Sequence, residues 1–241
     1  MASITVVDNK RHRDIRVFCE PKLSPQDGLG YVQVFPSELD AAHKEYPIFL
    51  KKNSVTGRFF LAALLSSDLH KNDFLIEGKW YSRYVPLVVR RGPFIIGRSG
   101  EVLNLCLDLD DDRVSSDGER LFDQNGEPTA MANKAISVLS LIHRGYQQSE
   151  ELIEALTAES LIEPITIKPT HGVGGANLKG LYSINPQRLR ELHGETLERL
   201  NSSSFLQSAY LLASSSSNVG FFFNKNNIFE KMWISTGNEG L

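Results

Sequence analysis

Four side chains between residues 79 and 94 are the best suited to hold a ligand. Trp80 and Tyr84 lie four residues apart, and Arg90 and Arg91 follow as an adjacent pair. Aromatic rings can stack on a peptide or an aromatic ligand, and arginine presents a planar fork of N–H donors that matches a carboxylate or a peptide backbone. Read as a strand, the segment places Trp80 and Tyr84 on one face. We therefore predict a site for a ligand or partner at these four residues, with core packing of Trp80 and Tyr84 as the alternative.

The charges around this site are unevenly distributed. Residues 79–98 contain five lysines and arginines and no acidic residue, whereas residues 101–127 contain nine acidic residues against Arg113 and Arg120. Neighbouring segments of opposite charge either face each other or a polar partner, or are solvated separately with little effect on stability.

The acidic segment has part of the spacing of a calcium-binding loop. Positions 1, 3, 5, 9 and 12 of such a twelve-residue loop are filled by Asp108, Asp110, Asp112, Ser116 and Glu119. Position 6 is Arg113, where the sharp turn normally requires glycine and where a cation would repel the ion. We therefore predict a structural turn without calcium, its negative charges relieved by solvent, by Arg113 or Arg120, or by the basic segment.

A second candidate site involves the histidines. His12 and Asp14 have the spacing of two ligands in a two-histidine, one-carboxylate iron site, and His143 or His171 would supply the third ligand. Such oxygenases carry the site on a barrel, and several strands precede the first ligands, whereas only eleven residues precede His12. The sequence therefore favours a chain without metal or cofactor. An iron-dependent oxidative enzyme that uses these residues is the alternative function.

Composition and missing motifs exclude several classes of protein. The 241 residues are 41% hydrophobic with a net charge of −3 and a pI near 6.1, which argues against a dedicated nucleic-acid-binding protein. No apolar run reaches the roughly 18–20 residues that cross a bilayer, and no secretory hydrophobic region stands near residue 1, so we expect a cytoplasmic protein. Neither the Gly-x-Ser-x-Gly elbow nor the Gly-x-x-x-x-Gly-Lys loop occurs. Cys19 and Cys106 are expected to be free thiols in the core.

The order of elements predicts an α+β fold, with an antiparallel β-meander in the first half packed by helices from the second half. A short helix is expected from Pro36, and strands are expected at residues 47–50, 58–65, 74–76, 80–89, 94–96 and 102–109. Later helices are expected to begin near Thr129, at Ser149 and at Asn185, with a hairpin of 165–167 and 178–184 between the last two. We expect residues 1–217 to form one domain and residues 218–241 a tail.

Several motifs, in order, resemble the SapC family of bacterial proteins over roughly residues 10–215. They are Glu45-Tyr46-Pro47-Ile48-Phe49, Gly78-Lys79-Trp80, Tyr84-Val85-Pro86, Arg90-Arg91-Gly92-Pro93-Phe94, Leu105-Cys106-Leu107-Asp108 and the stretch from Gly118 to Gly126. Members usually show a tyrosine where this chain has Gly92, so any ligand contact made by that tyrosine is absent here.

The resemblance implies an accessory role. Members of the family are similar to accessory proteins encoded beside outer-membrane receptors, tryptophan-halogenase-like flavoproteins and cupin-type oxygenases. We therefore expect a non-catalytic cytoplasmic accessory or binding protein that holds a peptide, a small ligand or a protein partner and associates with halogenase-like or oxygenase-like enzymes encoded nearby. The family name comes from a surface-layer locus, so a structural surface-layer protein is a further alternative.

Overall fold

The computed structural model describes residues 3–18, 30–67, 71–77, 79–100, 102–168 and 177–223. Its strands are β1 (Ile4–Val6), β2 (Arg16–Val17), β3 (Tyr31–Gln33), β4 (Ile48–Lys52), β5 (Phe59–Leu64), β6 (Leu75–Ile76), β7 (Lys79–Trp80), β8 (Phe94–Ser99), β9 (Val102–Asp108), β10 (Glu119–Arg120), β11 (Ile162–Ile167) and β12 (Leu178–Ile184). Its helices are α1 (Leu39–Ala42), α2 (Leu87–Arg90), α3 (Ala130–Ala158), α4 (Pro186–Glu191), α5 (Gly194–Ser202), α6 (Phe205–Ser215) and α7 (Gly220–Phe223), with 3-10 turns at Pro36–Glu38 and Ser216–Val219. The strand pairs of the described residues are antiparallel, and the predicted α+β class is confirmed.

The largest sheet has five strands in the order β11-β12-β4-β5-β3. The hairpin β4–β5 pairs Leu50 with Leu61, and β12 from the second half of the chain lies on the other side of β4, with Tyr182 opposite Leu50. The other described strands form a three-stranded sheet, β1-β9-β8, and two ribbons, β10-β2 and β6-β7. The antiparallel strands of the first half are thus shared among four sheets, one of which takes in two strands of the second half.

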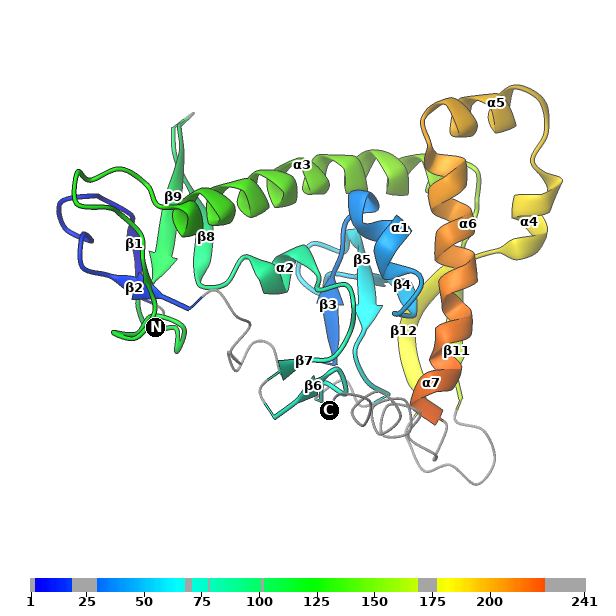
Figure 1. The fold of residues 1–241 in the computed structure, drawn as a ribbon. Helices are drawn as coiled ribbons and strands as arrows, with labels where there is room; N and C mark the ends of the chain where they lie inside the picture. The colour runs from blue at the N-terminus through cyan, green and yellow to red at the C-terminus, as the bar shows by residue number, and fades with distance from the viewer. Residues whose placement is uncertain are drawn as a thin grey trace, which may run out of the picture.

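Helix α3 joins the two ends of the molecule (Figure 1). Its N-terminal half packs Met131 and Ile142 into a core with α2, β8 and β9, and its C-terminal half packs Leu152 and Leu156 into a second core on the five-stranded sheet. A helix of 29 residues is about 43 Å long, which is enough to reach both cores. The cores therefore share one rigid element, with α2 lying between them beneath α3.

Close packing at the middle of α3 leads us to expect that a larger residue at position 145 lowers the stability of the protein. Gly145 faces Phe35, and a Cβ at position 145 would lie 2.5 Å from the Phe35 ring. Gly145→Ala is expected to lower the free energy of unfolding by about 1–3 kcal/mol, because the overpacking outweighs the roughly 1 kcal/mol that alanine gains in helix propensity. Urea denaturation measures the effect. Ser140→Ala, on the exposed face of the same helix, is the control, and a Gly145→Ala protein as stable as this control would contradict the close contact.

The second half contains one long helix where the sequence predicted two. The predicted start near Thr129 is confirmed, since the Thr129 hydroxyl accepts a hydrogen bond from the Ala132 N–H. The predicted start at Ser149 is wrong, because α3 continues through it. The Ser149 hydroxyl donates instead to the Gly145 carbonyl one turn earlier, at 2.8 Å. Inside a helix, a serine hydroxyl can donate its hydrogen bond to the carbonyl four residues earlier. The preference of serine for helix N-caps therefore did not mark the start of a helix at Ser149.

The segment from residue 80 to residue 89 does not form the predicted strand. Only Lys79 and Trp80 are in a strand, and Leu87–Arg90 is the helical turn α2. Pro86 precedes that turn with the fixed φ of its ring, and the Leu87 N–H donates to the carboxylate of Glu38, which is 49 residues away in the chain, at 2.8 Å. Trp80 and Tyr84 therefore do not share one face of a strand.

The last described residues pack onto the body of the protein. The side-chain amide of Asn218 donates to the carbonyls of His43 and Tyr46 at 2.8 and 3.1 Å, and Phe222 packs against the core. Cys106 is a buried free thiol, as expected, whereas Cys19 lies outside the described residues. Within the described ranges no helix has the length and apolar character to span a membrane.

Candidate ligand-binding site

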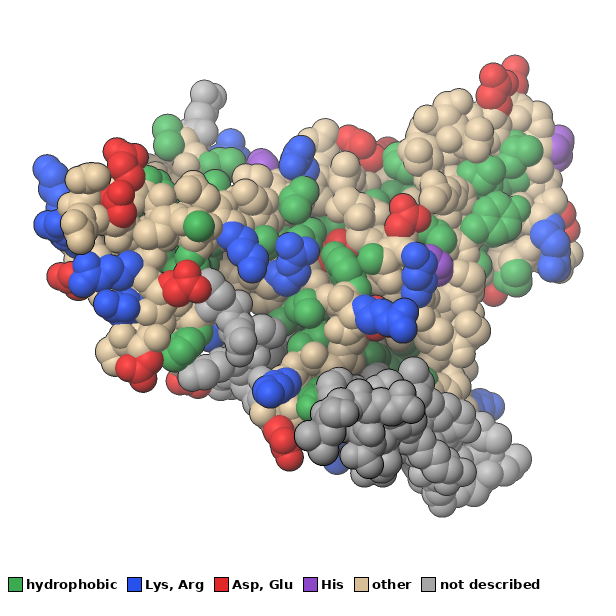
Figure 2. Space-filling model, in the orientation of Figure 1, with side chains coloured by type: hydrophobic (Ala, Val, Ile, Leu, Met, Phe, Trp, Pro, Cys, Tyr) green, Lys and Arg blue, Asp and Glu red, His purple; other side chains and the backbone are tan. Residues whose placement is uncertain are grey.

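A basic cavity of about 330 Å³ lies between α2, the start of β8 and the N-terminal half of α3. Its apolar lining includes Val89, Phe94 and Met131, all buried. None of the described residues that line it is acidic, and its cationic side chains are Arg83, Arg90, Arg91, Arg113 and Lys134. Figure 2 shows lysine and arginine side chains over α2 and beside α3, with apolar side chains between them. We call this the basic cavity.

A second cavity of about 300 Å³ adjoins the first. Three aromatic side chains line it, namely Tyr31 from β3, Phe60 from β5 and Trp80 from β7. The two cavities have four lining residues in common: Val89, Arg91, Gly92 and Arg113. We call the second one the aromatic cavity.

The five cations of the basic cavity divide into two groups. Arg91 donates to the Phe94 carbonyl at 3.1 Å, and Arg113 forms an ion pair. Within the described part of the chain, the side chains of Arg83, Arg90 and Lys134 form no salt bridge. All three side chains are exposed, so an anion that enters the cavity can reach them, although the charge of Arg90 also acts on Glu38 and Tyr84.

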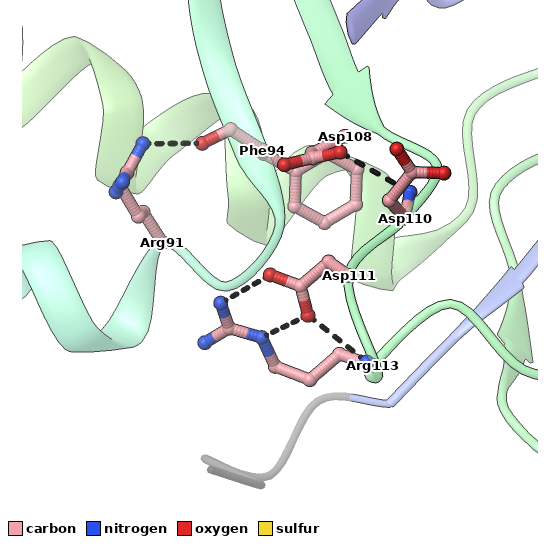
Figure 3. A network of polar contacts seen from close by, with 6 residues as sticks. All are labelled: Arg91, Phe94, Asp108, Asp110, Asp111 and Arg113. Atoms are coloured by element: carbon pink, nitrogen blue, oxygen red, sulfur yellow. Dashed lines mark hydrogen bonds and ion pairs between the residues drawn. The ribbon is translucent and has the colours of Figure 1, made fainter. Parts of the chain in front are cut away.

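Arg113 and Asp111 form a buried ion pair beside both cavities (Figure 3). The guanidinium donates to both carboxylate oxygens, at 2.8 Å from Nε and 2.6 Å from Nη2, and the Arg113 backbone N–H adds a third bond at 2.9 Å. Burial by itself would raise the pKa of the Asp111 carboxyl, but Arg113 outweighs burial and holds that pKa below its ordinary value. The acidic segment thus closes as a turn around Arg113, and the prediction that this arginine relieves negative charge is confirmed for Asp111.

A second buried carboxylate, Glu38, anchors the wall of the basic cavity. One of its oxygens accepts from the Tyr84 hydroxyl at 2.7 Å and from the Leu87 N–H at 2.8 Å, and the other accepts from the Phe35 N–H at 2.8 Å. Burial raises the pKa of Glu38, and the hydrogen bonds that it accepts and the charge of Arg90 offset only part of that rise. Glu38 therefore fixes Tyr84 and the start of α2 relative to the turn at Pro36–Glu38.

Trp80 is held by a network of hydroxyl groups. Its indole N–H donates to Tyr46 Oη at 2.9 Å and to Ser82 Oγ at 2.8 Å, and these two hydroxyls are hydrogen-bonded to each other. Ser82 in turn donates to the Tyr84 carbonyl at 2.6 Å. The polar edge of Trp80 is thus occupied inside the protein, and only its ring is left to contact a ligand.

The structure places all four predicted site residues at the two cavities. Tyr84, Arg90 and Arg91 line the basic cavity, and Trp80 and Arg91 line the aromatic one. The predicted core role also applies in part, because Trp80 and Tyr84 pack against the main core.

Sequence reasoning did not include Arg83, Arg113 and Lys134 in this site. For Lys134, the available signal was its place in the chain next to Met131 and Ala135, which face the core, because this puts Lys134 at the edge of the buried face of α3. The excess of acidic residues around Arg113 was the available indication that this arginine would be drawn into the fold.

His12 and Asp14 serve local structure. Nδ1 of the buried His12 accepts from the Asp8 N–H at 2.9 Å, and the side chain of Asp14 is 88% exposed, with Arg120 3.9 Å away. In the described ranges no three His, Cys, Asp or Glu side chains gather as a metal site would require, and His171 lies outside those ranges. The iron alternative therefore gains no support from the arrangement of these residues.

Comparison with known proteins gives one result that covers most of the chain. The model of the SapC family matches residues 7–220. No curated protein and no solved structure matches the chain. The matched range contains every described residue that lines the two cavities, together with Glu38 and Asp111. On this match, the chain belongs to the SapC family.

Proposed function

We propose that this protein is a non-catalytic cytoplasmic accessory protein, and that the basic cavity holds a ligand with an anionic group, such as a carboxylate, and an apolar body. The observation that carries the proposal is the convergence of Arg83, Arg90 and Lys134, without salt bridges in the described residues, on a cavity with an apolar lining. These three side chains are exposed, so an anion can reach them from solvent, while the apolar part of the same ligand packs on the buried wall of the cavity.

The groups beside the cavity favour binding over catalysis. The Ser82 hydroxyl is engaged by Trp80 and by the Tyr84 carbonyl, so it is not presented as a nucleophile. Burial raises the pKa of the Tyr46 and Tyr84 hydroxyls, which keeps both of them protonated. The described lining residues of the basic cavity include no carboxylate and no histidine to act as a general base.

The proposed accessory role requires a partner enzyme. We propose that the protein works with enzymes of the halogenase-like or oxygenase-like kind suggested by the family resemblance, and that the bound ligand is a small molecule exchanged with such an enzyme.

Titration with hexanoate, a small carboxylate with an apolar chain, tests the binding proposal. Arg90→Gln and Lys134→Gln are each expected to weaken hexanoate binding about ten- to a hundredfold, because each removes a charge-assisted contact to the carboxylate. Isothermal titration calorimetry measures the affinity, and thermal denaturation checks that each variant folds.

Arg98→Gln is the matched control for these variants. Arg98 belongs to the same basic segment but does not line the described cavities, and its side chain donates to the Gly100 carbonyl. The affinity of the Arg98→Gln protein for hexanoate should equal that of the unaltered protein. Equal affinity in all three variants, or no binding of hexanoate by the unaltered protein, would rule out the proposed site.

A further inference from the structure

The aromatic cavity presents three rings, with the polar side chains of Gln33, Arg91 and Arg113 also in its lining. The Tyr31 and Phe60 ring centroids lie 6.3 Å apart with planes tilted by 39°, and the indole N–H of Trp80 is already engaged. All three side chains are only partly buried, so part of each ring is uncovered. Surfaces of this kind favour a flat apolar group, which can contact several rings edge-on or face-on.

The two cavities meet at a point where the chain carries no side chain. Gly92 lines both cavities and has φ +62°, and a Cβ built on it would meet no atom within 4 Å. Arg91 and Arg113 also border both cavities, and because Asp111 balances the charge of Arg113, the net positive charge at this junction comes from Arg91. A ligand that extends past Gly92 would bring its apolar part to the rings while its anionic group stays beside the cations of the basic cavity.

We propose that the ligand is an aromatic carboxylate, with its carboxylate in the basic cavity and its ring in the aromatic cavity. This inference rests on the proposed function and adds the class of ligand. Each cavity lies at the lower end of the range of about 300–1,000 Å³ that ligand sites occupy, so a site that takes in both cavities also stays within that range. The cations of the basic cavity are complementary to a carboxylate, and the rings of the aromatic cavity are complementary to an aromatic ring on the same molecule.

Three probes separate this inference from the proposed function. Hexanoate tests the basic cavity alone, and 4-phenylbutanoate and decanoate have equal carbon number but differ in the ring. The 4-phenylbutanoate probe is expected to bind about tenfold more tightly than hexanoate and at least threefold more tightly than decanoate. It should also change the fluorescence of Trp80 in a Trp233→Phe protein, where Trp80 is the remaining tryptophan.

Matched variants locate the ring. Phe60→Leu should weaken 4-phenylbutanoate about threefold to tenfold and leave hexanoate unchanged. Phe59→Leu is the control, because Phe59 is the adjacent residue of the same strand but packs on Tyr182, with ring centroids 4.8 Å apart, outside the lining of the aromatic cavity. Gly92→Asn, which introduces a residue that tolerates the left-handed conformation, should fill the junction and weaken 4-phenylbutanoate more than hexanoate, since Gly92 also lines the basic cavity.

The outcomes distinguish the two proposals. If hexanoate binds and depends on Arg90, but decanoate binds as tightly as 4-phenylbutanoate or Trp80 fluorescence does not respond, the aromatic assignment is wrong and the proposed function stands. If none of the three carboxylates binds to the folded protein, both proposals are wrong. Selective binding of 4-phenylbutanoate that Phe60→Leu weakens and Phe59→Leu does not would support the assignment.

Discussion

Arg113→Ala is expected to lower the free energy of unfolding by about 3–5 kcal/mol, the largest effect in this protein, because it leaves Asp111 buried without its cation. The side chains of Arg113 and Asp111 are 5% and 8% exposed, so water cannot replace the lost partner. Urea denaturation at neutral pH measures the change. Arg58→Ala is the control, since Arg58 pairs with Glu150 at 2.7 Å but both side chains are largely exposed, and its loss should cost less than about 1 kcal/mol.

The same ion pair predicts a pH dependence. Because the pKa of Asp111 is lower in the folded than in the unfolded protein, the ion pair stabilises the fold fully above the unfolded pKa of about 3.9. This stabilisation is lost as the pH falls from that value through the folded pKa. The difference in unfolding free energy between the unaltered protein and Asp111→Asn should therefore shrink below about pH 4. A difference that stays constant from about pH 6 down to pH 2.5 would contradict the role given to Arg113.

Glu38→Ala is expected to lower the free energy of unfolding by a similar amount, about 3–5 kcal/mol, because three donors lose their acceptor together. The loss also frees Tyr84 and the first turn of α2, so binding of hexanoate in the basic cavity should weaken in the fraction that remains folded. Urea denaturation followed by tryptophan fluorescence measures the stability, and calorimetry measures the binding.

Two further variants make the Glu38 prediction specific. Glu38→Gln keeps one oxygen acceptor and should cost less than Glu38→Ala. Glu154→Ala changes an exposed glutamate on α3 and should alter the unfolding free energy by no more than about 0.5 kcal/mol. A Glu38→Ala protein as stable as Glu154→Ala would show that the buried carboxylate does not hold the wall of the cavity.

Local chemistry explains which parts of the fold were predictable. Thr129 and Asn185 cap helices through their own side chains, and Asn185 accepts from the N–H groups of Gln187 and Arg188 just after it. The strands β4, β5, β8 and β9 follow apolar runs bounded by turn residues, and the hairpin β11–β12 formed as predicted. Each of these features depends on residues close together in the chain.

The candidate site was predictable only in part, for the same reason. Residue type alone was enough to single out Trp80, Tyr84, Arg90 and Arg91, because aromatic rings and guanidinium groups suit ligand binding wherever they lie. Their division between two cavities depends on α2, which Glu38 holds from 49 residues away. Lys134 joins them from a helix that begins some 40 residues later in the chain than α2.

The α+β class, the strands β4, β5, β8 and β9, the starts of α3 and α4, the basic character of residues 79–98 and the resemblance to the SapC family could all be read from the amino-acid sequence. The helical turn at residues 87–90, the continuation of α3 through Ser149 and the burial of Arg113 against Asp111 became visible only in the folded chain. These three features depend on hydrogen bonds and packing between distant segments, which override local preferences of a few tenths to about 1 kcal/mol per residue.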